Sequence, residues 1–152
     1  MMDSNKCKAI VTKFIDEILN QGKLSRLHSL VHPDFRFHGM PDTETLEDLK
    51  LAFAYLHINW TTIYHNVHFE INNISVENNI VTVEITRKGI LNERYGATQS
   101  PNEVNIVKQL EQYRIVDGKI KERWINHLES KREPFAPQHY SQSGIQLSGD
   151  LG

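Results

Sequence analysis

Apolar residues near the start of the chain recur at the spacing of a helix. Six of them fall on one side of such a helix: Ile10, Val11, Phe14, Ile15, Ile18 and Leu19. An apolar stripe of this period predicts an amphipathic helix. Asp3 or Ser4 supplies a candidate N-terminal cap, and Gly22 is expected to end the helix.

Two further helical patterns follow, with a short strand between them. Regularly spaced leucines predict a short helix over residues 25–31, which Pro33 ends because proline disfavours helical geometry in the residue before it. Residues 35–38 predict a short strand. Apolar residues at helical spacing then predict a third helix over residues 44–57, after a turn and cap at residues 41–43.

From residue 67 onward the apolar pattern changes to a period of two. The alternation over residues 67–71 predicts a strand, and two asparagines at 72–73 break its phase as a β-bulge would. The strand resumes up to a turn at residues 78–79, and a second strand follows that turn. A loop around residues 96–101 then leads into a long strand over residues 104–116.

The last hairpin turns at Asp117-Gly118 and carries polar residues among its apolar ones. Asp-Gly between two alternating runs predicts a two-residue turn. Regular pairing across this turn puts eight side chains on one face: Gln109, Glu111, Tyr113, Ile115, Ile120, Glu122, Trp124 and Asn126. The opposite face carries Arg114, Lys121 and Arg123, and is expected to be the wetter one.

The face with the isoleucines is therefore predicted to look inward, and it takes Glu111 and Glu122 with it. Burying unpaired carboxylates is costly. A curved sheet that lines a partly wet pocket relieves this cost, and such pockets bind ligands. The alternatives are that the two carboxylates reach water at a rim, pair with an arginine across the fold, or turn outward through a one-residue register slip.

The order of elements predicts one α+β domain. Helices come first and antiparallel strands follow, so we expect a cone-shaped, curved antiparallel sheet wrapped around the N-terminal helices. A chain of 152 residues suits a single domain, here over residues 1–133. From residue 134 the composition shifts to Pro, Gln, Ser and Gly, which predicts a tail over residues 134–152 that is flexible or ordered by a partner chain.

Charge and composition narrow the range of partners. The formal net charge is −2 and the pI is about 6.4, so neither nucleic acid nor an anionic membrane is an expected partner. Cys7 is the single cysteine and cannot form an internal disulfide. The first residues are polar, and no apolar run approaches the ~20 residues that span a bilayer. We therefore expect a cytoplasmic protein.

Three segments together resemble the SnoaL-like polyketide cyclase group of the nuclear transport factor 2-like superfamily. The first runs from Asn20-Gln21-Gly22 to His38-Gly39. The second is the strand over residues 81–86, followed by Gly89 and Gly96. The third, over residues 113–124, has an aromatic-Arg strand, a Gly-Lys-Ile turn and a tryptophan. They occur in the family's order within residues 10–128.

The resemblance implies a cystatin-like, conical α+β barrel whose deep pocket acts on a small hydrophobic molecule without a metal or an organic cofactor. It also implies a homodimer, commonly formed through the outer face of the sheet. Cyclases of this group close a carbon ring by an aldol reaction, in which an acidic residue after the tryptophan serves as acid and base. This chain departs from that pattern, because Asn126 and Leu128 occupy the pocket-facing positions after Trp124, and Ile90-Leu91 replaces a Thr-His pair.

Glu111 and Glu122 are the first candidates for proton transfer. Burial among aromatic and aliphatic side chains shifts the pKa of a carboxyl upward, toward the range in which general acid/base catalysis works at neutral pH. The alternative is that one of them belongs to a structural pair with Arg36, Arg87 or another internal base.

The other candidates on this face are aromatic or amide side chains. His38 is the third catalytic candidate, because an imidazole titrates near neutrality, although a rim histidine is the alternative. Tyr113 would donate a hydrogen bond to a carbonyl oxygen, or lie in the core. Trp124, Asn126 and Gln109 complete the predicted ligand-binding set.

Metal and phosphate chemistry are not favoured. His65 and His68 lie at the entry of a predicted strand, where a spacing of three places them on opposite sides. They lack a third ligand at a familiar spacing. The sequence also lacks a glycine-rich phosphate loop and a nucleophile elbow in a suitable context.

The leading hypothesis is a small-molecule pocket protein that performs cofactor-independent acid/base chemistry on a hydrophobic carbonyl compound, as a cyclase, isomerase or dehydratase. The alternative is a non-catalytic module of the same fold that binds a small molecule or forms dimers. A carboxyl that titrates near neutrality would favour the enzyme.

Overall fold

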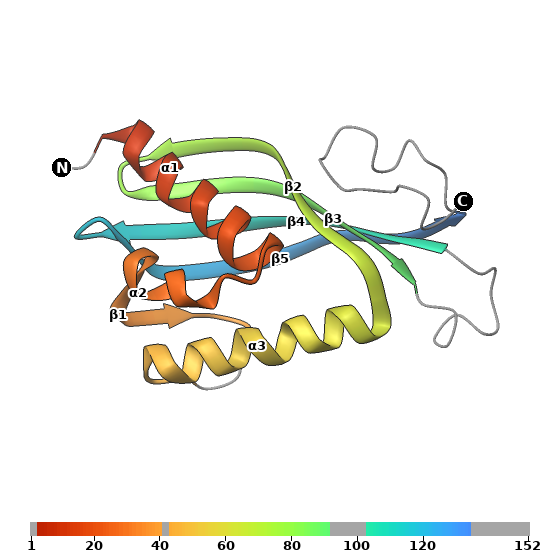
Figure 1. The fold of residues 1–152 in the computed structure, drawn as a ribbon. Helices are drawn as coiled ribbons and strands as arrows, with labels where there is room; N and C mark the ends of the chain where they lie inside the picture. The colour runs from red at the N-terminus through yellow and green to blue at the C-terminus, as the bar shows by residue number, and fades with distance from the viewer. Residues whose placement is uncertain (1–2, 41–42, 92–102, 135–152) are drawn as a thin grey trace.

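The computed structural model describes residues 3–40, 43–91 and 103–134. In these residues five strands form one curved sheet, and the helices cover one of its faces (Figure 1). We call this the helix-covered face, and the opposite side the outer face. The elements in chain order are α1 (Ser4–Lys13), the π-helix η1 (Phe14–Asn20), the 3-10 turn η2 (Leu24–Arg26), α2 (Leu27–Leu30), β1 (Val31–Phe37), α3 (Leu46–Ile63), β2 (Tyr64–Glu77), β3 (Ile80–Leu91), β4 (Glu103–Val116) and β5 (Lys119–Pro134).

The sheet has the strand order β1-β5-β4-β3-β2. Strands β2 to β5 pair with their neighbours in antiparallel fashion, whereas β1 pairs with β5 in parallel. Parallel pairing needs a long connection, and the chain between β1 and β5 supplies one with a helix and three strands. The predicted α+β fold is therefore confirmed, with a mixed sheet instead of a wholly antiparallel one.

The first predicted helix is confirmed at both ends. The Asp3 carboxylate accepts a hydrogen bond from the backbone N–H of Asn5 at 2.7 Å. Gly22 follows η1 with a φ of +67°, a left-handed geometry that suits glycine. The second predicted helix is present as η2 and α2.

The third helix starts two residues later and runs six residues further than predicted. Its cap is Thr45, and not a residue within 41–43. The Thr45 hydroxyl accepts from the backbone N–H of Asp48 at 3.1 Å, and the Asp48 carboxylate accepts from the backbone N–H of Thr45 at 3.3 Å. These reciprocal bonds form a capping box. Thr43 and Thr45 are both acceptable caps by residue type, so the local pattern does not choose between them.

Replacing Thr45 with alanine is expected to lower the free energy of unfolding by about 1 kcal/mol, because the cap bond is lost. Thr61→Ala is a matched control in the same helix, since Thr61 is exposed and its hydroxyl donates to backbone carbonyls of the preceding turn. Alanine there should be neutral or slightly stabilising. Chemical denaturation measures both changes, and equal effects would contradict the capping role.

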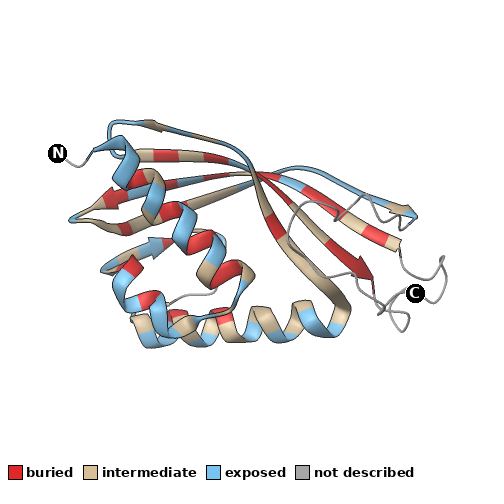
Figure 2. Ribbon diagram, turned by 45° about the horizontal axis from the view of Figure 1, so that its top comes forward, coloured by how far each residue is buried: buried red, intermediate tan, exposed pale blue. Residues whose placement is uncertain are grey.

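Aromatic rings fill the core between the helices and the sheet. Phe14 packs edge-on against Phe37, Phe53 and Tyr113, with ring centroids 5.9, 5.8 and 5.7 Å away. All four side chains are buried, and buried positions gather where the helices face the strands (Figure 2). Aromatic pairs favour this geometry, so the cluster fixes how the helices sit on the sheet.

The predicted bulge and turns are confirmed. The register of β2 against β3 shifts between Ile71 and Asn73, and the turn residues Asn78, Asp117 and Gly118 have φ angles of +58°, +53° and +74°. The loop predicted at residues 96–101 and the predicted tail beyond Pro134 lie outside the described residues. Among the helices of the described ranges, none is long and apolar enough to cross a membrane.

Candidate functional site

The hairpin of β4 and β5 distributes the predicted site residues over two faces instead of one. Ile115 pairs with Ile120 as predicted, but the next pair is Arg114 with Glu122, which leaves Lys121 as an extra residue. This bulge shifts the alternation of β5 by one position. The predicted pairs of Tyr113 with Glu122, of Glu111 with Trp124 and of Gln109 with Asn126 are therefore wrong. Tyr113 pairs with Arg123, and Gln112 pairs with Trp124.

The bulge has a clear electrostatic consequence. A regular ladder would place Glu122 next to Tyr113 and Glu111 on the helix-covered face, which would bring two carboxylates together. The observed register brings Arg123 there instead, so the buried Glu111 gains a counter-charge. A buried charge persists only when it is paired. The prediction that Arg123 lies on the wetter face is wrong for this reason.

Glu111 is the centre of a buried polar cluster on the helix-covered face, and it is 0 % exposed. Arg123 donates to Glu111 Oε1 from Nε at 3.1 Å and from Nη2 at 2.9 Å. The Tyr113 hydroxyl donates to the same oxygen, and Gln109 Nε2 donates to Oε2. Both carboxylate oxygens thus accept hydrogen bonds, as an ionised carboxylate requires.

Aromatic rings enclose the Arg123 guanidinium. Its Cζ lies 5.5 Å from the ring centroid of Phe14, 5.9 Å from that of Phe37 and 5.7 Å from that of Tyr113. Burial alone lowers the pKa of Arg123, but Glu111 and Tyr113 outweigh burial and raise this pKa above its ordinary value. The side chain therefore remains a cation inside the core.

Tyr113 stays protonated in this cluster. Burial raises its pKa well above the ordinary value, Arg123 acts in the opposite direction, and Glu111 raises the pKa further. Its proton is committed to the Glu111 carboxylate. The role of hydrogen-bond donor to a substrate carbonyl that the sequence allowed for Tyr113 is therefore not available in this arrangement, and its place in the core is what the structure shows.

Gln109 ends the cluster with an unsatisfied acceptor. The side chain is 3 % exposed, its Nε2 is held by Glu111, and no donor in the described residues reaches its buried Oε1. The carboxylate accepts only, so it fixes the amide with the nitrogen toward Glu111 and the oxygen away from it. Buried acceptors without partners are rare and call for a ligand or water.

Two further basic residues share this face and were missed as site candidates. Arg87 on β3 is half-buried; burial lowers its pKa, while Tyr64 and Glu111 raise it in part. The register pairs His127 directly with Gln109, so both lie on one face, with His127 exposed. The strand alternation alone would have placed Arg87 inward, whereas His127 turns inward only because of the bulge.

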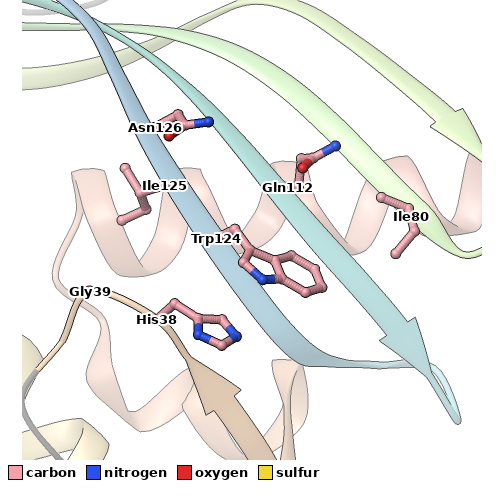
Figure 3. A pocket seen from close by; sticks show the side chains of 7 residues that line it. All are labelled: His38, Gly39, Ile80, Gln112, Trp124, Ile125 and Asn126. Carbon is pink, nitrogen blue, oxygen red and sulfur yellow. The ribbon is translucent and has the colours of Figure 1, made fainter.

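The remaining candidates form a second group on the outer face. His38 Nε2 lies 2.6 Å from Glu122 Oε2, and its ring stacks on Trp124 with centroids 5.4 Å apart. Asn126 lines a hollow of about 390 Å³ next to them. Figure 3 shows His38, Trp124 and Asn126 from the side of the sheet opposite α3. The sheet therefore separates His38, Glu122, Trp124 and Asn126 from Gln109, Glu111 and Tyr113.

No three His, Cys, Asp or Glu side chains of the described ranges are grouped as a metal ion requires. His65 pairs with Ile90 in β2, and His68 pairs with Lys88 after a register shift. Burial lowers the pKa of His68, against the pull of Glu70 and Asp16. The register shift inserts one extra residue between them, so both histidines lie on the face of Ile90 and Lys88, and the expectation that they lie on opposite sides is wrong.

Comparison with known proteins identifies relatives. A family model described as SnoaL-like polyketide cyclase matches residues 9–127. TsrD from Streptomyces laurentii superposes with a TM-score of 0.65 at 16% identity, over 84% of this chain and 91% of that one. IdmH from Streptomyces antibioticus, described as a putative polyketide cyclase, gives 0.64 at 17% identity, over 80% and 91%.

A Bacillus cereus protein with the same description as IdmH gives a TM-score of 0.63 at 22% identity, over 80% of this chain and 74% of that one. At these identities the structural likeness shows the fold alone. No curated protein matches the sequence. The expected nuclear transport factor 2-like fold is thus confirmed, and the family match covers most of the chain.

Proposed function

The chain belongs to the SnoaL-like polyketide cyclase family, and from this premise we propose that it binds a small, largely apolar carbonyl compound on the helix-covered face and rearranges it by cofactor-independent acid/base chemistry. The observation that carries the proposal is the buried, unsatisfied Oε1 of Gln109. A buried acceptor without a hydrogen bond lowers the stability of the fold. A hydroxyl or enol group of a ligand would donate the missing hydrogen bond.

The buried cluster prepares Gln109 for this role. Arg123 and Tyr113 hold Glu111, and Glu111 holds the Gln109 amide. Because its amide is already held by Glu111, the Gln109 side chain loses little conformational entropy when a ligand binds. In this proposal Glu111 is a positioning residue, because its lone pairs are taken by neighbouring donors and it does not face the ligand as a free base.

Arg87 and His127 supply the proposed chemistry. An imidazole beside Gln109 can accept a proton from the carbon next to a ligand carbonyl, since a neutral imidazole has an unprotonated ring nitrogen. The Arg87 guanidinium would stabilise the negative charge that then develops on the carbonyl oxygen. In ring closure the enolate carbon bonds to a second carbonyl carbon, and the new alkoxide oxygen takes the proton back from His127.

Binding without turnover is the second candidate function. The saturation of Glu111 by donors favours it, because the one fully buried acid of the cluster is fixed structurally. The resemblance also implies an acidic residue after Trp124, whereas the register places Ile125 and His127 at the inward positions there. Under this alternative Gln109 would still bind the ligand, but His127 would have no effect on any reaction.

Gln109→Ala is expected to weaken binding of a hydroxylated aromatic ketone, 5-hydroxy-1-tetralone, by about tenfold or more, because the single hydrogen bond to Oε1 is lost. Gln112→Ala is the matched control, since Gln112 is an exposed glutamine of the same strand on the outer face. Calorimetric titration measures both affinities. Equal affinities of the two variants would refute Gln109 as the ligand contact.

Proton exchange separates the enzyme from the binding module. If the chain is an acid/base catalyst, it should accelerate exchange of the protons next to the tetralone carbonyl in D₂O, as followed by NMR. His127→Asn should abolish the acceleration and leave the affinity within about threefold. Binding without any acceleration by the unaltered protein would establish the non-catalytic alternative.

A further inference from the structure

The outer face carries a polar cluster that the proposed function does not use. β1 runs beside β5, and the backbone N–H of His38, just after β1, donates to the Arg123 carbonyl at 2.9 Å. This bond fixes His38 next to Trp124, where the two rings lie within 9° of parallel. The bulge at Lys121 turns Trp124 toward this face, so the arrangement depends on the same irregularity as the buried pair.

The Glu122 carboxylate contacts two basic side chains of this cluster. Glu122 lies 2.6 Å from His38 Nε2 through Oε2, and 3.7 Å from Arg114 Nη2 through Oε1. The Arg114 guanidinium also lies 5.7 Å from the Trp124 ring centroid. The Trp124 indole beside these side chains is only partly buried.

A hollow of about 390 Å³ opens beside this cluster. Trp124 and Ile80 give it apolar walls, and Gln112 and Asn126 place amide groups along it (Figure 3). Its volume falls in the range of about 300–1,000 Å³ that is typical of small-molecule sites, as does the combination of apolar walls with a few polar groups.

We propose that this hollow is a second binding site, separate from the helix-covered face, and that it takes an aromatic carboxylate. The apolar walls accept the ring system, and the amide N–H groups together with the Arg114 guanidinium are donors that suit a carboxylate. An aromatic cation would meet the Arg114 guanidinium as a like charge. A ligand here cannot contact Gln109, because the sheet lies between the two groups.

NMR titration with naphthalene-2-carboxylate tests the proposal. The chain has two indole N–H resonances, from Trp60 and Trp124, and Trp60→Phe tells them apart. Saturable movement of the Trp124 resonance is expected, with the Trp60 resonance unchanged because that residue packs against Phe69 on the other side of the sheet. Naphthalene-2-carboxamide, the neutral analogue, should bind at least about tenfold more weakly.

Two variants assign the binding to this site. Arg114→Gln should weaken binding of the carboxylate by about tenfold, in line with the loss of one charge-assisted contact. Gln109→Ala should leave it unchanged, so failure of this site and failure of the proposed function are distinguishable. The proposal is overturned by a Trp124 resonance that does not move, by equal binding of acid and amide, or by wild-type affinity in Arg114→Gln.

A second copy of the chain is the competing occupant of this face, since the resemblance to the family implies a homodimer there. Dilution of the protein without ligand tests this occupant. A Trp124 resonance that shifts with protein concentration, and that no longer responds to the carboxylate, overturns the proposal. A resonance that is independent of protein concentration and responds to the carboxylate supports it.

Discussion

Arg123→Leu is expected to lower the free energy of unfolding by about 3–5 kcal/mol, which is the usual effect of removing one partner from a buried ion pair. Leucine is an apolar side chain that suits the aromatic surroundings of Arg123, but it leaves the Glu111 carboxylate buried without its counter-charge. The loss should therefore come from Glu111, and not from a cavity. Urea denaturation followed by circular dichroism measures it.

Arg114→Leu is the matched control for this result. Arg114 is also an arginine of the hairpin and also approaches a glutamate, but its side chain is 45% exposed and the distance to Glu122 is 3.7 Å. Exposed pairs of this kind contribute less than about 1 kcal/mol. If Arg123→Leu is as mild as Arg114→Leu, the guanidinium of Arg123 is not in the core.

Phe14→Ala has the second largest expected effect, a loss of about 3–5 kcal/mol. The Phe14 ring touches three other aromatic rings and the Arg123 guanidinium, and it lies where α1 passes into η1. Alanine would leave a cavity between these groups, and the rigid strands that carry Phe37 and Tyr113 cannot close it. The same denaturation experiment measures the change.

Tyr55→Ala is the control for the loss of an aromatic ring. Tyr55 is 66% exposed on α3, so its removal should change the free energy of unfolding by less than about 0.5 kcal/mol. A Phe14→Ala variant as stable as Tyr55→Ala would show that the aromatic cluster does not hold the helices on the sheet.

Local patterns were sufficient to predict the elements of this fold. The apolar spacing before Gly22 predicted the first helix, because helix burial requires a period near 3.6. Asn78-Asn79 and Asp117-Gly118 predicted turns, because few residues tolerate positive φ, and the broken alternation at residues 72–73 predicted the bulge. The cap of α3 was placed wrongly, since Thr43 and Thr45 satisfy the same local rule and the choice between them depends on the path of the chain.

The site was harder to predict because one extra residue in β5 reverses the side chains of residues 122–127, up to a second register shift at Leu128. Nothing in the local sequence around Lys121 marks it as a bulge; what stabilises the bulge is the meeting of Arg123 with Glu111, twelve residues away along the chain. The burial of Glu111, Tyr113 and Gln109 followed from alternation in β4 and is confirmed. The alternation in β5 placed Glu122, Trp124 and Asn126 on the wrong face.

The rule that charged residues mark the wet face also failed for a physical reason. An arginine can enter a core when a carboxylate and aromatic rings receive it, and both were present on the facing elements. The sequence raised a structural pair of Glu111 or Glu122 with Arg36, Arg87 or another internal base as an alternative, and the pair of Glu111 with Arg123 is of that kind. Arg123 can be identified as the partner of Glu111 only when the register between β4 and β5 is known.

A double-mutant cycle between Glu111 and Arg123 tests the central claim most directly, namely that these two charges are buried together beneath the helices. Each residue is replaced by leucine, singly and together, and the free energy of unfolding is measured by urea denaturation. We predict an interaction energy of at least about 2 kcal/mol, which means that the double variant loses that much less stability than the two single variants together. The same cycle between Glu122 and Arg114 should give an interaction energy of less than about 1 kcal/mol. Additive effects of Glu111→Leu and Arg123→Leu would contradict the account.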